Sequence, residues 1–168
     1  CQAHGTTHGG KPVGTIGDCA AFSCNQNKIH CSGEGGFFVS NDDAIFERGK
    51  TLWYFGEHRR PDTGTDYKAY GMGWMYRSSE LVAAFARAQL ARLNEYLPQI
   101  KANAQRLTEC LTGTPNLILP VTPPGHGHNF YNYTIRFDMD ALGHAADAAR
   151  FRDRLLKALQ AEGVDTSV

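Results

Sequence analysis

The sequence predicts an α/β protein, and three observations support this fold class. Two short apolar runs, at 20–24 and 37–40, are bounded by Gly and Asn and are typical of buried strands. From about Ser79 to Leu111, apolar residues recur at steps of three and four, which predicts a long amphipathic helix. Two strand-like segments and a second amphipathic segment follow, an order that fits the start of a small α+β domain.

Composition and charge limit the classes of function that this chain can have. The chain has 168 residues, of which 42% are hydrophobic and 20% are charged, enough for one ordinary domain with a sizeable core. Its 17 basic and 17 acidic residues cancel, so neither a nucleic acid nor a membrane partner is expected. No apolar run reaches the roughly 20 residues of a membrane helix. Because the chain starts at Cys1 and stops at Val168, where a strand-like pattern begins, we expect an internal piece of a longer protein.

The cysteines favour a reducing compartment. An odd number, five, without a regular framework indicates free thiols in a cytoplasmic protein. Several Cys and His residues crowd the first 31 positions, so a zinc-binding module is an alternative function. However, zinc sites usually show paired spacing such as C-x-x-C, which is missing here, and we predict no metal site. The residues concerned are Cys1, His4, His8, Cys19, Cys24, His30 and Cys31.

The elements before the long helix follow from glycine and capping signals. Residues 1–18 are rich in glycine and predict a loop or a hairpin. The side chains at 41–43 can cap a helix that runs from about Ala44 to Leu52. The segment from Gly56 to Tyr70 is polar and is predicted to be a loop.

The long helix has a clear start and one internal interruption. Ser78 or Ser79 is the predicted N-cap, with Glu80 in the first turn. Pro98 lies inside the apolar pattern and should kink or break the helix near 95–97, since proline lacks a backbone N–H.

The C-terminal segments read as strand, strand and helix. Strands are predicted over 116–121 and over the aromatic stretch 130–137, which favours a buried sheet over a nucleic-acid platform because no basic cluster accompanies it. A helix is predicted over 146–162, ended by Gly163.

Lys28 is the most informative single residue. It lies on the polar loop between the two apolar runs, where a cleft can form. A lysine amine has an ordinary pKa of about 10.4 and becomes a nucleophile only where burial or a neighbouring cation removes its proton. The alternative is that Lys28 is an ordinary solvent-exposed loop lysine. Arg59 and Arg60, in the polar loop, are expected to contact either solvent or an anionic substrate.

Three landmarks in order carry a family resemblance. They are the pattern F-S-x-x-x-x-K-x-x-x-x-G-E-G-G at 22–36, the run Q-A-H-G at 2–5 before it, and Y-R-S-S-E-L at 76–81 after it. Together they resemble the cofactor-lysine region of the DegT–DnrJ–StrS sugar aminotransferases, which are pyridoxal-phosphate (PLP) enzymes of fold type I.

The resemblance implies both fold and function. Residues 1–112 would be the C-terminal part of a three-layer α/β/α large domain with its long linking helix, and 113–168 the first part of an α+β small domain. The implied enzyme is a homodimer that moves an amino group from glutamate or glutamine to a keto-sugar, a nucleotide-linked keto-sugar or a keto-cyclitol. A non-catalytic regulator with this fold is the alternative, and the chain by itself is expected to be inactive.

The resemblance also implies roles for individual residues. Lys28 would hold PLP as an internal aldimine and then act as base and acid, while Ser23 would donate to the cofactor phosphate. Gln2 would lie beside the cofactor ring, and the family's ring-nitrogen aspartate would precede Cys1.

Three further roles follow from the same resemblance. Met75 stands where the family usually has an asparagine that reaches the phosphate of the partner subunit. Arg77 would supply that contact instead, or else form a salt bridge at the start of the helix. His4, Arg59 and Arg60 are the implied substrate-binding residues.

Overall fold

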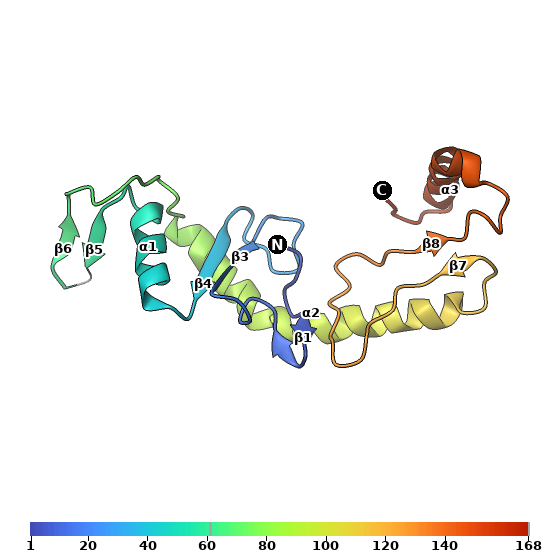
Figure 1. Cartoon of the computed structure of the whole chain (residues 1–168), viewed down its shortest axis with the longest axis horizontal. Coiled ribbons are helices and arrows are strands. Elements are labelled where there is room, and N and C mark those ends of the chain that lie inside the picture. Colours follow the sequence, from blue (N-terminus) through green and yellow to red (C-terminus); the bar gives the residue numbers. More distant parts are fainter. Residues whose placement is uncertain (61, 168) are drawn as a thin grey trace. The chain divides into compact units, whose positions relative to one another are not determined.

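A computed structural model describes residues 1–60 and 62–167, with the side chains of Arg60 and Thr65 outside the description. Within these residues the chain forms eight short strands, three α-helices and one 3₁₀ turn (Figure 1). In chain order they are β1 (Thr7–His8), β2 (Lys11–Pro12), β3 (Cys19–Ser23), β4 (Gly36–Ser40), α1 (Asp43–Trp53), β5 (His58–Arg60), β6 (Gly64–Asp66), α2 (Glu80–Leu111), β7 (Leu117–Ile118), β8 (Arg136–Phe137), the 3₁₀ turn (Ala145–Asp147) and α3 (Ala148–Ala161).

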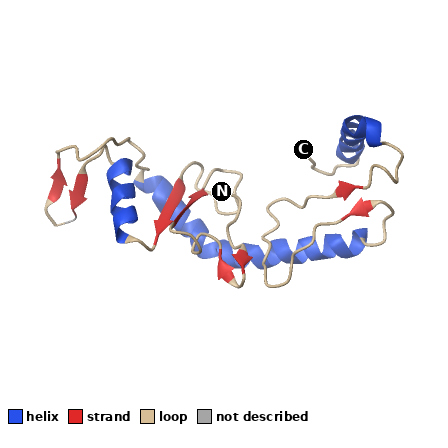
Figure 2. Ribbon diagram, viewed as in Figure 1, coloured by secondary structure: helices blue, strands red, loops and turns tan. Residues whose placement is uncertain are grey.

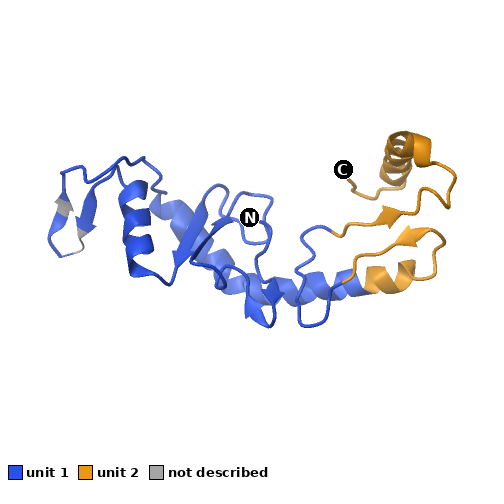
Figure 3. Ribbon diagram, in the orientation of Figure 1, with its two compact units in different colours: residues 1–105, 122–132 blue, residues 106–121, 133–168 orange. Residues whose placement is uncertain are grey.

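The described strands pair only locally. They form four two-stranded antiparallel sheets, each made of consecutive strands (Figure 2). The predicted three-layer α/β/α arrangement therefore stays a prediction. The chain divides into two compact units, residues 1–105 with 122–132 and residues 106–121 with 133–168 (Figure 3).

The predicted strands around Lys28 form a hairpin. β3 and β4 pair in register from Cys19 opposite Ser40 to Ser23 opposite Gly36. The expectation that both strands are buried was wrong, since all their residues are half-buried or exposed and Phe38 is 42% exposed. Successive strand residues point to opposite faces, so Phe38 lies next to Gly49 of α1 while Phe22 and Phe37 lie next to His4 and His30, and the described chain covers neither face fully.

Helix α1 begins where its capping residue predicts. The Asp42 carboxylate accepts a hydrogen bond from the Ile45 backbone N–H at 2.9 Å, which satisfies one orphan donor of the first turn. Gly49 lets the helix approach β4 closely, because a Cβ there would lie 2.6 Å from the Phe38 ring. The predicted helix is confirmed, with Asp43 and Trp53 as its ends.

The segment predicted as a polar loop contains a hairpin. β5 and β6 pair with His58 opposite Asp66. Gly64 has φ of 82°, the left-handed backbone that lets the chain reverse between the two strands. The pattern was missed because both strands are polar and so lack an apolar alternation.

Helix α2 is continuous through its proline. Ser79 accepts a hydrogen bond from the Val82 N–H at 3.3 Å, which confirms it as a capping residue. The expected break at Pro98 was wrong, since one helix runs from Glu80 to Leu111. Proline removes a single intrahelical bond, and α2 is also held by tertiary contacts, for example where Gly5 meets the Leu97 side chain. No helix within the described residues has the length and apolar character needed to cross a membrane.

The C-terminal strands are shorter than predicted. Of the two predicted segments, only β7 and β8 pair, with Leu117 opposite Phe137. Phe130 has φ of 51°, which ends the extended conformation near the start of the aromatic stretch. The final helix is confirmed as α3, and Gly163, with φ of 83°, follows its end.

Candidate active site

A tight turn presents Lys28. The Lys28 N–H donates to the Asn25 carbonyl at 2.9 Å, and the Asn27 N–H donates to the Asn25 side chain at 3.2 Å. The Asn25 amide in turn donates to the Glu34 carboxylate at 2.6 Å, which ties the turn to the glycine-rich segment. The lysine therefore stands on a loop whose backbone is fixed at both ends.

The Lys28 amine is half-buried against an aromatic residue. Its Nζ donates to the Tyr131 hydroxyl at 3.4 Å and lies 5.1 Å from the centre of the Tyr131 ring. Among residues 1–60 and 62–167, no carboxylate lies within ion-pair distance of Nζ. The amine is thus oriented by a neutral group and is not committed to a counter-ion.

Ser23 lies at the end of β3, where the turn begins. Its Oγ accepts the Asn25 N–H at 3.3 Å, and in the described part of the chain its hydroxyl proton has no acceptor. A half-buried hydroxyl with a free proton is suited to bind an oxyanion. Ser23 and Lys28 thus flank one turn with two groups of complementary chemistry.

Asn129 links the N-terminal segment to Tyr131, the residue that contacts the Lys28 amine. Its buried amide donates to the carbonyls of Gln2 at 2.7 Å and His4 at 3.0 Å, and its side-chain oxygen accepts the Tyr131 N–H at 3.1 Å. Sequence reasoning missed Asn129 and Tyr131, which lie about 100 residues beyond Lys28 and carry no local motif. Gln2 itself is exposed and meets this network through its backbone.

His4 is buried, although it was predicted to meet substrate. Its ring lies 5.3 Å from Phe22 and 5.6 Å from His30, and neither of its nitrogens has a hydrogen-bond partner. Burial lowers the pKa of His4, and the nearby His30, N-terminal amine and Lys28 act in the same direction, which favours the neutral ring. An unsatisfied buried N–H costs about 1–3 kcal/mol. Burial argues against direct contact with substrate.

Cys24 and His30 form a second buried pair. Cys24 Sγ lies 3.6 Å from His30 Nδ1, and His30 Nε2 donates to the Ala86 carbonyl of α2 at 2.9 Å. Burial raises the pKa of the Cys24 thiol, and the neighbouring Cys31 adds to this effect. Cys24 is thus buried, whereas Cys19 at the start of β3 is exposed.

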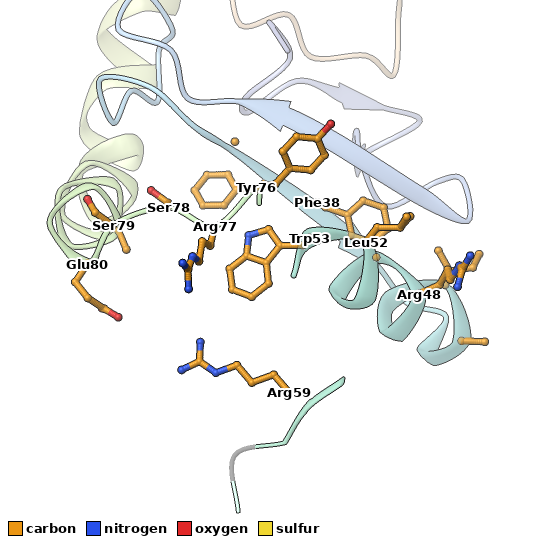
Figure 4. A pocket seen from close by; sticks show the side chains of 16 residues that line it. Phe38, Arg48, Leu52, Trp53, Arg59, Tyr76, Arg77, Ser78, Ser79 and Glu80 are labelled. Atoms are coloured by element: carbon orange, nitrogen blue, oxygen red, sulfur yellow. The ribbon is translucent and has the colours of Figure 1, made fainter. Parts of the chain in front are cut away.

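A separate pocket of about 1220 Å³ lies beside α1 and the start of α2. Figure 4 shows the guanidinium groups of Arg59 and Arg77 facing the same open space next to the Trp53 indole. Both guanidiniums also contact the Tyr54 ring, at 5.6 and 5.5 Å from its centre. Two such groups are suited to a carboxylate or phosphate ligand. Neither Lys28 nor Ser23 lines this pocket.

Arg77 makes no salt bridge at the start of the helix within the described part of the chain. Its guanidinium instead donates to the Met75 sulfur at 3.7 Å, and Met75 is 61% exposed. The alternative role for Arg77 is therefore not seen here. The prediction for the Arg60 side chain lies outside the described residues.

The family model of the DegT/DnrJ/EryC1/StrS aminotransferases matches residues 1–168. A Streptoalloteichus tenebrarius protein, provisionally named L-glutamine:3-amino-2,3-dideoxy-scyllo-inosose aminotransferase, is 36% identical over 98% of this chain. The chain spans 38% of that relative's length.

Another relative is named for a nucleotide-linked sugar instead of a cyclitol. A dTDP-3-amino-3,4,6-trideoxy-alpha-D-glucose transaminase of Micromonospora megalomicea is 32% identical over 99% of this chain and 41% of its own length. The crystal structure of S. venezuelae DesV, in complex with a ketimine intermediate, matches with a TM-score of 0.80 at 31% identity, covering 98% of this chain and 40% of that one. These neighbours support the predicted fold, and the chain belongs to the DegT/DnrJ/EryC1/StrS aminotransferase family.

Proposed function

We propose that the full protein is a PLP-dependent aminotransferase. It moves an amino group from glutamate or glutamine to a keto-sugar, a nucleotide-linked keto-sugar or a keto-cyclitol. The observation that carries the proposal is Lys28, a half-buried amine on a fixed turn with no carboxylate partner in the described chain. The names of the relatives, which include cyclitol and nucleotide-sugar aminotransferases, support the substrate class.

The residues present fit the cofactor. Lys28 offers an uncommitted amine for its aldehyde, and Ser23 offers a free hydroxyl proton for its phosphate. Gln2 is proposed to lie beside the ring, and Arg77 to contact the cofactor phosphate of the partner subunit. Bound PLP supplies an electron sink for the carbon that loses or gains the amino group.

Lys28 is proposed to serve twice. As a nucleophile its Nζ holds the cofactor between turnovers, and as a free amine the same atom takes a proton from the substrate carbon and returns it. The Tyr131 hydroxyl, which accepts from Nζ at 3.4 Å, orients the amine for both tasks. The backbone hydrogen bond from Lys28 to Asn25 fixes the part of the chain from which this side chain extends.

The arginines of the pocket are proposed to bind anionic groups. Arg59 and Arg77 converge on one space from different segments, an arrangement suited to a phosphate or carboxylate ligand. Arg60 remains a proposed substrate contact, and His4 does not, because it is buried.

A homodimer is the proposed assembly. Several large apolar residues between β6 and α2 each expose more than half of their surface. They are Tyr67, Tyr70, Met72, Trp74, Met75 and Tyr76. Such a group favours burial against a second subunit. All five cysteines are free, in keeping with the proposed cytoplasmic location.

Covalent labelling of Lys28 tests the proposed function. The full protein, expressed from its complete reading frame, is incubated with PLP, reduced with borohydride and digested for peptide mass analysis. We expect one cofactor adduct per chain, on Lys28. Lys50 is the internal control, because it is paired with Glu47 at 2.8 Å and should stay unlabelled. Labelling elsewhere, or none, would favour the non-catalytic regulator.

Ser23→Ala should weaken cofactor binding without unfolding the hairpin. Losing one hydrogen bond to a charged phosphate is expected to raise the dissociation constant of PLP about 10- to 100-fold. Equilibrium dialysis of the full protein measures this change. Ser40→Ala is the matched control, since Ser40 ends the paired strand and donates to the Asp18 carbonyl at 2.7 Å. Equal losses in both variants would mean that Ser23 acts only through the strand.

A further inference from the structure

Three metal-ligating side chains meet in the buried interior next to the lysine turn. His4, Cys24 and His30 each offer one ligand atom, and these atoms lie within 4.8 Å of one another. All three residues are buried, with exposed fractions of 7%, 1% and 0%. They come from the N-terminal segment, the residue just after β3 and the segment after Lys28, so the fold and not a local motif brings them together.

The distances suit ligands of one metal ion. With metal–sulfur and metal–nitrogen bonds of about 2.3 and about 2.0 Å, two ligands on one ion lie roughly 3.5–4 Å apart. Cys24 Sγ and His30 Nδ1 are already 3.6 Å apart. His4 would need to approach by about 1 Å to close the set.

The surrounding hydrogen bonds leave the ligand atoms available. His30 Nε2 donates to the Ala86 carbonyl at 2.9 Å, so Nδ1 keeps its lone pair toward Cys24. Such an outer contact is typical of metal-ligating histidines, because it fixes the tautomer and the ring orientation. His4 has two buried nitrogens without any partner, and a metal bond would satisfy one of them.

We infer that His4, Cys24 and His30 form a buried binding site for a soft metal ion, Cu⁺. Thiolate and imidazole ligands together suit copper and zinc. One thiolate and two neutral imidazoles make the site electrically neutral with Cu⁺ but leave a net positive charge with Zn²⁺, which burial penalises. Zn²⁺ also usually takes four ligands, and the described residues supply three.

Binding would join three segments that frame the lysine turn. The Cys24 thiol proton is released to solvent as the Cu–S bond forms, and no electron is transferred. The ion would then hold the N-terminal segment against the two ends of the turn that carries Lys28. Its role is therefore structural, and it is separate from the amino-transfer chemistry.

The test uses the full protein and Cu⁺ under anaerobic conditions. Cu⁺ is titrated in competition with a chromophoric chelator, and bound metal is counted per chain. We expect one tightly held equivalent, one proton released, and a higher melting temperature. Cys24→Val and His4→Phe should each lower the affinity by about 100-fold or more. His4→Phe should leave the metal-free protein no less stable, because it removes an unsatisfied buried ring.

Two controls separate this site from adventitious binding. Cys110→Val removes an exposed thiol, and His8→Phe removes an exposed imidazole, and both should bind Cu⁺ like the parent protein. Equal binding by all variants would overturn the proposal, since exposed thiols would then account for the metal. Preferential retention of Zn²⁺ over Cu⁺ would overturn the assignment to copper.

Discussion

Replacing Lys28 with arginine is expected to lower amino transfer by the full protein by about 10³-fold or more. Arginine keeps the charge and most of the length, and it can still donate to Tyr131. It does not lose its proton near neutral pH, so it supplies neither a nucleophile nor a base. The variant therefore separates the reactive amine from a merely cationic side chain.

Single-turnover assays should locate the loss in the chemical step. With amino donor in excess, the first half-reaction of Lys28→Arg should be slow while donor binding changes little. Lys50→Arg is the control, because Lys50 is exposed on α1 and pairs with Glu47. Near-parental rates for Lys28→Arg would contradict the proposed role and favour a different base.

Gly73→Ala is expected to lower the free energy of unfolding by about 3 kcal/mol. A Cβ at Gly73 would overlap the backbone of Phe55 and Gly56, which cannot move aside as a flexible side chain can. The backbone segments at residues 55–56 and 73–74 are also held together, since the Phe55 N–H donates to the Trp74 carbonyl at 3.1 Å. Urea unfolding of the full protein measures the change.

Gly17→Ala is the matched control for this effect. Neither glycine has a positive φ, and the nearest atom to a Cβ at Gly17 is 3.9 Å away. The control should change stability by no more than about 0.5 kcal/mol. Similar losses in both variants would mean that the tight approach of residue 73 to residue 56 contributes little.

The same close approach bears on function. Tyr76 and Arg77 lie three and four residues after Gly73 and line the pocket with Arg59. Backbone displacement at residue 73 would move one guanidinium relative to the other, so binding of an anion to this pocket depends on the glycine. Here the stability of the scaffold and the geometry of a candidate site rest on one position.

The sequence by itself determined the features that depend on near neighbours. The extended segments that become β3 and β4, the Asp42 and Ser79 caps and the lysine segment each follow from residues within a few positions of one another. Turn formation, helix capping and strand propensity depend on residues at that range, so they can be predicted from the sequence. The family resemblance rests on the same local motifs.

Only the tertiary structure decided which distant groups meet. Tyr131 reaches the Lys28 amine across 103 positions, and Asn129 bonds to Gln2 across 127. His4 becomes buried beside His30, and α2 stays continuous through Pro98. These outcomes depend on packing between segments that are far apart in the sequence. Such packing produces no periodic pattern or unusual composition, because a contact can stabilise the fold without a particular residue type at a fixed spacing.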